Sequence, residues 1–272
     1  MDAFNALVKV LRAVLPAEAR RIGRQLLTRS SSTQWSIDYQ IVPGWPTTTQ
    51  SFSTPEVRER LKKGLETFDV GVALENPIVR DNLTILGMTG LSEATLLDFG
   101  CGNGIYCRLL AAFPTTSRWK YVGADIDAEM ITWCRTRHPG VRFELIEDNG
   151  AKVFRDNEFD LVLASGVVQY INEYTEAFSE LHRIVRDRIL VSRLPLWKYH
   201  PSEIVLQHVR HEWGEEHHPM HVFNRDTLNL LFTRLGFLPV FQDYGSEFFH
   251  VPAIAEPVVF NSYLLKKIQL QR

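Results

Sequence analysis

A short glycine-rich stretch, DFGCGNG at residues 98–104, is the part of the sequence best suited to bind a ligand. It follows an apolar run of strand length and precedes a helical pattern. Glycines at alternate positions let ligand atoms approach the main chain, and the start of the helix offers N–H groups that lack partners. The dinucleotide fingerprint would place its third glycine at Ile105, and the lysine of a phosphate-binding loop is absent.

A second acidic residue stands at the spacing that a nucleoside site requires. Asp125 ends the apolar run 121–126 and lies 21 residues after Gly104. A carboxylate at this place can accept hydrogen bonds from both hydroxyls of a ribose. Asp127 is expected to cap the helix that follows. Together with the glycine loop, Asp125 indicates a ligand that contains a nucleoside.

The segments around these residues have the alternating pattern of an α/β protein. The apolar runs span residues 95–100, 121–126, 142–146, 159–165 and 188–194, with helical patterns at 103–113, 127–137 and 171–185, and further runs at 237–244 and 260–268. Strand-length runs that alternate with helix-length segments predict a mostly parallel, doubly wound sheet with helices on both faces. We therefore expect residues 91–272 to form the core domain.

The first 90 residues have a different sequence pattern. They are expected to form a cap of helices and loops without a strand. Helical patterns cover 2–15, 17–28, 54–68 and 77–87. Between them, residues 31–50 are rich in Ser, Thr and Pro but also contain Trp35, Tyr39 and Trp45. Such aromatics either lie over a ligand or pin the loop to the core. The basic face of 17–28 favours packing with a solvated side over contact with an anionic membrane.

Composition excludes several classes of function. A net charge of −2 over 272 residues gives no general support for nucleic-acid binding. Three cysteines without a CxxC pair suit a reducing compartment, and no apolar run is as long as a membrane span. We expect a cytoplasmic enzyme whose partner is a small molecule; a homodimer and weak peripheral membrane contact stay open.

The glycine loop and its acids resemble the class I S-adenosylmethionine-dependent methyltransferases. The loop resembles their first motif, and FDLVLASGVVQYI at 159–171 resembles their fourth-strand motif. The resemblance implies a Rossmann-like, doubly wound, seven-stranded, mostly parallel sheet, S-adenosylmethionine as cofactor and S-adenosylhomocysteine as product. It implies cofactor contacts from Asp98, Gly100, Cys101, Gly102, Asp125, Ile126, Met130, Asp148, Ser165 and Gly166, with Glu147 as the alternative to Asp148.

Residues 40–265 also resemble, more diffusely, a bacterial methyltransferase family. The segments that carry this likeness include LVSRLPL at 190–196 and HHPMHVFNRDTLNLLFTRLGF at 217–237. Members of the family are often associated with surface-polysaccharide gene clusters and have no settled substrate. The resemblance favours a small-molecule or sugar acceptor.

The acceptor side is expected in an insertion at about 195–225, where six of the nine histidines lie between residues 200 and 221. A general base for a hydroxyl acceptor is the favoured role of this cluster, with His217, His218 and His221 as candidates. A metal site using Glu212, Glu215 and Glu216 is the weaker alternative, because no ligand spacing such as HExxH is present. The third is a polar lid whose histidines make ordinary hydrogen bonds, and for any single histidine it is favoured over catalysis.

Tyr170 and Arg193 each have a functional and a structural explanation. Tyr170 could orient the acceptor or pack on the aromatic loop, and Arg193 could clamp an anionic group or pair with Glu203 or Asp226. The expected acceptor contacts are Trp35, Tyr39, Gln169, Arg193, His208 and His211, with Tyr170 added to the catalytic candidates.

The sequence thus predicts O-methylation of a small molecule such as a sugar or a secondary metabolite. N-methylation is the nearest variant. The rivals from other classes are a protein that binds S-adenosylmethionine without transferring its methyl group and an NAD-dependent oxidoreductase.

Overall fold

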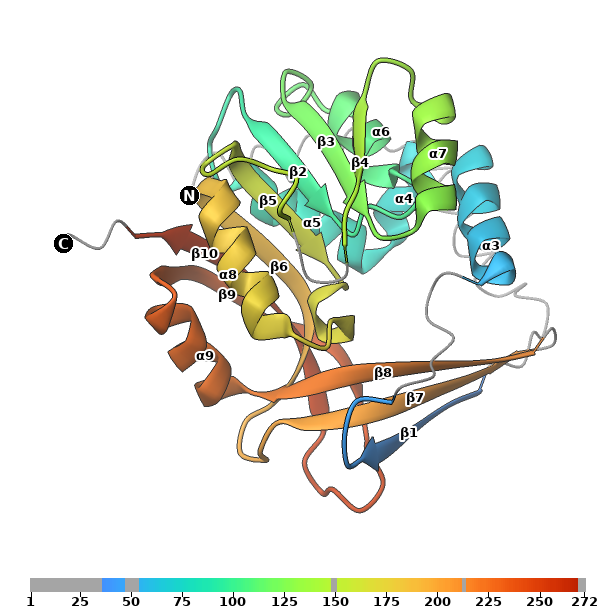
Figure 1. The fold of residues 1–272 in the computed structure, drawn as a ribbon, viewed down its shortest axis with the longest axis vertical. Helices are drawn as coiled ribbons and strands as arrows, with labels where there is room; N and C mark the ends of the chain where they lie inside the picture. Colours follow the sequence, from blue (N-terminus) through green and yellow to red (C-terminus); the bar gives the residue numbers. More distant parts are fainter. Residues whose placement is uncertain (1–35, 47–53, 148–150, 212–213, 269–272) are drawn as a thin grey trace.

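The structure is a computed structural model that describes residues 36–46, 54–147, 151–211 and 214–268. Its centre is a seven-stranded sheet in the order β4-β3-β2-β5-β6-β10-β9 (Figure 1). The strands are β2 (Thr95–Phe99), β3 (Lys120–Asp125), β4 (Arg142–Leu145), β5 (Phe159–Ser165), β6 (Val185–Trp197), β9 (Phe237–Phe249) and β10 (Val258–Lys267). Of these seven strands, β10 alone runs opposite to the rest, and it pairs antiparallel with β6 and β9. The predicted doubly wound α/β fold is confirmed.

Helices cover both faces of this sheet. The helices are α3 (Pro55–Glu66), α4 (Val70–Glu75), α5 (Pro77–Gly87), α6 (Ile105–Ala112), α7 (Ala128–Arg137), α8 (Tyr174–Ile184) and α9 (Arg225–Arg234). Side chains alternate across each strand, so Leu97 and Val162 pack toward α8 and α9, whereas Leu96 and Leu161 pack toward α5 and α6. The core strands are therefore buried on both sides, which explains their continuous apolar runs.

The starts of the helices that flank the site follow from their sequences. Thr54 and Asp127 accept hydrogen bonds from main-chain N–H groups in the first turns of α3 and α7, and Pro55 occupies the first position of α3. The predicted capping role of Asp127 is confirmed. These caps fix where α3 and α7 begin, next to the carboxyl end of β3.

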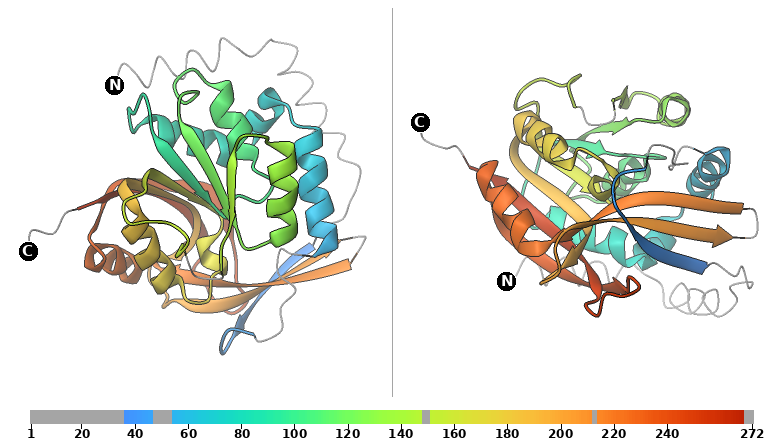
Figure 2. Two further views of the ribbon diagram at one scale, coloured as in Figure 1. Left: turned by 45° about the horizontal axis from the view of Figure 1, so that its top comes forward. Right: turned by 60° about the horizontal axis from the view of Figure 1, so that its bottom comes forward.

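Three antiparallel strands, joined to the main sheet through β6, correct the expectation for the N-terminal part. Residues expected to be an irregular loop form β1 (Ser36–Val42), which pairs with β7 (Glu203–His211), and β7 forms a hairpin with β8 (Gly214–Asn224). Tyr39 and Ile41 pack on an apolar cluster that contains Trp197 and Val205. Distant pairing, which local composition does not reveal, makes this strand. Figure 2 shows the three strands extending from the main sheet.

Parts of the sequence that bear on membrane contact lie outside the described residues, including the helical patterns at 2–15 and 17–28. Within the described residues, no helix is long and apolar enough to cross a bilayer.

Candidate cofactor and acceptor site

A cavity of about 660 Å³ opens at the carboxyl ends of β2, β3 and β5. Ligands of open α/β sheets bind at this edge. Its lining residues come from the glycine loop, the β3–α7 turn, η1 (Val168–Tyr170), β8 and α3. They are Trp45, Leu61, Phe99, Gly100, Gly102, Asp125, Ile126, Asp127, Met130, Ile146, Ser165, Gly166, Val167, Tyr170, Ile171, Asn172, Glu173, His218 and Pro219.

The glycine loop is held close to the neighbouring strands by its own main chain. The N–H groups of Gly100 and Cys101 both donate to the carbonyl oxygen of Ala124, at 2.8 and 2.9 Å. Gly100 has a φ of +78°, and a Cβ atom there would lie 2.7 Å from Cγ2 of Val167. Only glycine fits this position, so the loop offers a ligand bare main chain.

Asp125 lines the cavity and ties the glycine loop to the β3–α7 turn. Its carboxylate accepts hydrogen bonds from the N–H of Gly102 at 2.8 Å and of Asp127 at 3.0 Å. Burial raises the pKa of Asp125, and the main-chain N–H groups of Gly102, Asp127 and Ile126 oppose that rise. A carboxylate has about four acceptor sites, so two can still receive hydroxyl groups from a ligand. These acceptor sites fit the two hydroxyl groups of a ribose.

Apolar side chains complete the nucleoside side of the cavity. Ile126 is 46% exposed and Met130 is buried, and both line the cavity, as does Ile146 just after β4. Such side chains suit a flat base. Ile146 was not predicted, because an apolar residue at a strand end resembles any core residue. Asp148 lies outside the described residues, and Glu147 is exposed.

Asp98 and Cys101 are buried but do not line the cavity. Asp98 accepts a 2.7 Å hydrogen bond from the hydroxyl group of Tyr121. Burial raises the pKa of Asp98 to about 7, and the Tyr121 hydrogen bond only partly offsets this. The cofactor roles expected for both residues stay predictions.

The raised pKa of Asp98 makes the stability of the ligand-free protein pH-dependent. Folding favours the protonated carboxyl, so this contribution to stability is complete below about pH 4 and is lost as the pH rises through about 7. Relative to Asp98→Asn, we expect the melting temperature of the wild type to fall by roughly 5 °C between pH 5 and pH 8. Equal pH dependence in both proteins, measured by calorimetry, would contradict this assignment.

Ser165 lines the cavity within a polar network that the sequence did not reveal. Asn82 of α5 donates to the hydroxyl oxygens of Ser165 and of Tyr106, at 2.8 and 2.6 Å, and Ser192 donates to Ser165 at 3.1 Å. Asn82 is 1% exposed. The network fixes α5 and α6 against the carboxyl ends of β5 and β6, so it sets the position of the cavity wall. Gly166 lies next to it.

His218 lines the cavity; the other two candidate bases do not. It is buried, and its Nε2 lies 2.9 Å from Oε2 of the buried Glu216. Burial lowers the pKa of His218, against the opposing effect of Glu216. A neutral ring that donates from Nε2 keeps its lone pair on Nδ1. The expected role of His218 as a general base stays a prediction.

The remaining histidines have other surroundings. His217 is largely exposed and pairs across the hairpin with His208, and their ring centroids are 4.6 Å apart. Burial lowers the pKa of His221, whose Nε2 lies 3.0 Å from the carbonyl oxygen of Asn172 and whose ring stacks on Trp45. Within the described residues, no group of three or more His, Cys, Asp or Glu side chains is placed to hold a metal ion.

The two tyrosines expected on the acceptor side lie in different places. Tyr170 lines the cavity, and burial raises its pKa to about 12. Tyr39 stacks on Phe249, and its hydroxyl oxygen accepts from Gln207.

Arg193 and Gln169 lie outside the cavity lining. Arg193 pairs with Glu247 at 2.8 Å instead of the partners weighed from the sequence, and its guanidinium lies over Phe260. Gln169 is buried. Trp35 and the side chain of His211 lie outside the described residues.

Comparison with known proteins identifies the central domain. Residues 97–188 match the model of a family described as "Methyltransferase domain". The chain therefore contains a segment similar to a methyltransferase domain. The cofactor of such a domain is S-adenosylmethionine, and the bare glycine loop, Asp125 and the apolar wall fit it.

Two curated relatives match about half of this chain. A malonyl-[acyl-carrier protein] O-methyltransferase from Geobacter sulfurreducens is 25% identical over 135 residues, which are 48% of this chain and 49% of the relative. A bifunctional methionine biosynthesis protein from Rhodopirellula baltica is 28% identical over 144 residues, 50% of this chain and 22% of the relative. The chain therefore spans half or less of the length of these relatives.

Solved structures share the fold of this chain at low sequence identity. A 1,6-didemethyltoxoflavin-N1-methyltransferase from Burkholderia thailandensis, with bound S-adenosylhomocysteine, has a TM-score of 0.53 at 18% identity and covers 87% of this chain and 96% of its own. The [4+2]-cyclase SpnF has a TM-score of 0.55 at 15% identity, with 84% and 98% covered. A cyclase with this fold means that the fold alone does not assign a reaction.

Proposed function

We propose that the protein transfers a methyl group from S-adenosylmethionine to an oxygen atom of a small-molecule acceptor. The observation that carries this proposal is that one cavity is lined by Gly100, Asp125 and the Glu216-bound His218. This lining supports a cofactor site and a base that share one cavity. The relative named as an O-methyltransferase is consistent with transfer to oxygen.

The protein has two tasks in this reaction: it aligns the acceptor with the methyl group, and it removes the proton of the acceptor hydroxyl. Bound S-adenosylmethionine supplies an activated methyl group on a sulfonium. His218 takes the proton of the acceptor hydroxyl as the oxygen–methyl bond forms and the carbon–sulfur bond breaks, which leaves S-adenosylhomocysteine. Glu216 holds the ring and stabilises the imidazolium that forms. Because burial lowers the pKa of His218, the ring is neutral and ready to accept a proton at pH 7.

A ring-shaped acceptor suits the aromatic residues of the cavity. Trp45 and Tyr170 offer flat faces, and Pro219 and Ile171 add apolar surface next to His218. A sugar or a secondary metabolite has both a ring and a hydroxyl group. The resemblance to a family often associated with surface-polysaccharide gene clusters makes sugars the first acceptors to screen.

Replacing His218 tests the role of the base. With an acceptor that supports formation of S-adenosylhomocysteine, His218→Asn is expected to lower kcat about 10²-fold while the affinity for S-adenosylhomocysteine stays within twofold. In the wild type, kcat should hold at pH 7 and fall only below the ordinary histidine pKa, because burial lowers the pKa of His218. Product formation followed by mass spectrometry measures both.

His217→Asn is the matched control, since His217 lies on the same strand but is 46% exposed and outside the cavity lining. It should retain near wild-type kcat. Equal rates for His218→Asn and wild type would remove His218 from the mechanism. If no acceptor yields S-adenosylhomocysteine although the cofactor binds, a cofactor-binding protein with another activity becomes the better account.

A further inference from the structure

Helix α3 contacts both sides of the cavity. Leu61 in its middle lines the cavity, and the carbonyl oxygen of Leu61 accepts a 2.8 Å hydrogen bond from the amide of Asn103 in the glycine loop. Arg58 reaches the start of α7, and Arg60 reaches Glu216 on β8. Figures 1 and 2 show α3 alongside α7. A single helix therefore connects the cofactor side with the acceptor side.

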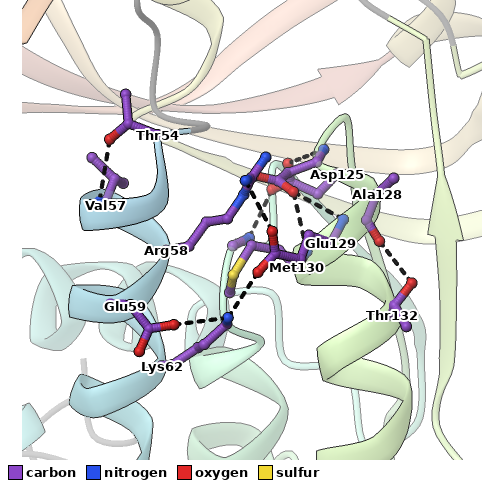
Figure 3. A network of polar contacts seen from close by, with 12 residues as sticks. Thr54, Val57, Arg58, Glu59, Lys62, Asp125, Ala128, Glu129, Met130 and Thr132 are labelled. Atoms are coloured by element: carbon purple, nitrogen blue, oxygen red, sulfur yellow. Dashed lines mark hydrogen bonds and ion pairs between the residues drawn. The ribbon is translucent and has the colours of Figure 1, made fainter.

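On the cofactor side, a continuous chain of polar contacts runs from Arg58 to Asp125 (Figure 3). Nε of Arg58 donates to Oδ2 of Asp127 at 2.7 Å. The other oxygen of Asp127 accepts from the N–H groups of Glu129 and Met130, and the N–H of Asp127 donates to Asp125. Besides Asp127 itself, the turn that Arg58 fixes carries Asp125, Ile126 and Met130 of the cavity wall.

The Arg58 contact also balances charge beside the ribose-binding candidate. Asp127 and Asp125 are close enough that each carboxylate raises the cost of ionising the other. Burial alone would raise the pKa of Asp127, but the hydrogen bond from Arg58 and the capped N–H groups hold it below its ordinary value. Asp127 is 6% exposed and Arg58 21%, so solvent screens this pair less than a surface ion pair.

On the acceptor side, Arg60 lies near the carboxylate that holds His218. Its Nη1 is 3.8 Å from Oε1 of Glu216, while Oε2 of Glu216 binds Nε2 of His218. The charged and titratable groups around His218 are Glu216, Arg60 and His217, and the Tyr170 ring lies 6.3 Å away. Arg60 is a cation that opposes protonation of His218.

We propose that α3 is a strap that positions both halves of the site: Arg58 acts on Asp125 through Asp127, and Arg60 acts on His218 through Glu216. Neither arginine is a catalytic residue. The cofactor half needs only that S-adenosylhomocysteine binds in the cavity, whereas the acceptor half rests on the proposed role of His218 as a base. Both the affinity of the protein for S-adenosylhomocysteine and the basicity of His218 then depend on α3.

Calorimetric titration with S-adenosylhomocysteine tests the cofactor half. Arg58→Gln is expected to raise Kd about 10-fold, and Arg58→Lys to restore part of the loss. Lys63→Gln removes the same charge from an exposed position of α3, and its Kd should equal that of the wild type. In an Asp127→Asn background, Arg58→Gln should have little further effect on Kd, because the two residues act as one unit.

Hydrogen exchange separates positioning from simple stabilisation of the fold. Binding of S-adenosylhomocysteine should protect the amides of 55–66 in the wild type and in Lys63→Gln, but not in Arg58→Gln. A lower melting temperature with an unchanged Kd and unchanged protection would make α3 a structural helix only.

The acceptor half is tested by the titration of His218, which requires no substrate. NMR of ¹³C-labelled histidine, assigned with His218→Asn, should show a higher pKa for His218 in Arg60→Gln, because an opposing cation is gone. Kd for S-adenosylhomocysteine should stay within twofold in this variant. An unchanged His218 pKa would overturn the role of Arg60.

These results distinguish the strap from the proposed function. If the wild type does not bind S-adenosylhomocysteine, both are wrong. If the wild type binds and Arg58→Gln binds equally well, the strap is wrong and the methyltransferase proposal stands.

Discussion

Replacing Asp125 by alanine is expected to weaken the binding of S-adenosylhomocysteine about 10³-fold. The carboxylate anchors the N–H groups of Gly102 and Asp127, and we assign its remaining acceptor sites to the ribose hydroxyls. Hydrogen bonds to a charged group contribute about 1.5–3 kcal/mol each. Two lost bonds to the ligand correspond to roughly 10²- to 10⁴-fold in affinity.

Calorimetric titration of purified variants measures this loss. Asp125→Asn keeps the size of the side chain and one acceptor oxygen, so it should fall between alanine and the wild type. Glu93→Ala removes an exposed carboxylate outside the cavity lining and should leave Kd unchanged. A Kd within threefold of wild type for Asp125→Ala would show that the ribose does not depend on this residue.

Gly100→Ala is expected to abolish measurable binding of S-adenosylhomocysteine. The new Cβ would stand 2.7 Å from Cγ2 and 2.9 Å from Cβ of Val167, at a φ of +78° that alanine rarely adopts. Real Cβ atoms do not approach other atoms so closely, so the loop or the start of η1 must shift. Either shift moves the main chain that lines the cavity.

Gly140→Ala separates the backbone cost from the clash. Gly140 has a similar φ of +83°, but a Cβ there would have no atom within 4 Å. We expect Gly140→Ala to lower stability by about 1 kcal/mol and to leave Kd unchanged. Gly100→Ala combined with Val167→Ala should recover part of the binding. Equal Kd values for Gly100→Ala and wild type would contradict the close approach of the ligand to this loop.

The sequence predicts the core of the fold well because its strands are buried on both faces. Continuous apolar runs such as FDLVLAS at 159–165 have few interpretations other than a central strand. Strand β1 escaped prediction because SIDYQIV is mostly exposed and becomes a strand by pairing with β7, more than 160 residues away. Its partner is set by tertiary structure, which a local window does not contain.

The sequence likewise predicts one part of the candidate site and leaves the other part open. The glycine loop and Asp125 are recognisable because a nucleoside site needs particular residue types at particular spacings. The histidine cluster gave three candidate bases, and the direction of side chains along β8 separates two of them: Glu216 and His218 are buried on one side, while Glu215 and His217 are exposed on the other.

Contacts between distant elements were beyond the sequence. Arg58 and Arg60 belong to an ordinary basic helix by composition, and nothing local indicates that they meet Asp127 and Glu216. Trp45 was noted only as an aromatic residue of a loop. Its position in the cavity wall depends on the hairpin against which that loop lies.

Direct titration of the purified protein with S-adenosylmethionine and S-adenosylhomocysteine, with NAD as the comparison ligand, tests the central claim. The geometry of the glycine loop and Asp125 predicts micromolar binding of both sulfur ligands and no binding of NAD. Binding of NAD alone, or of none of the three by a folded protein, would contradict a methyltransferase site in this cavity.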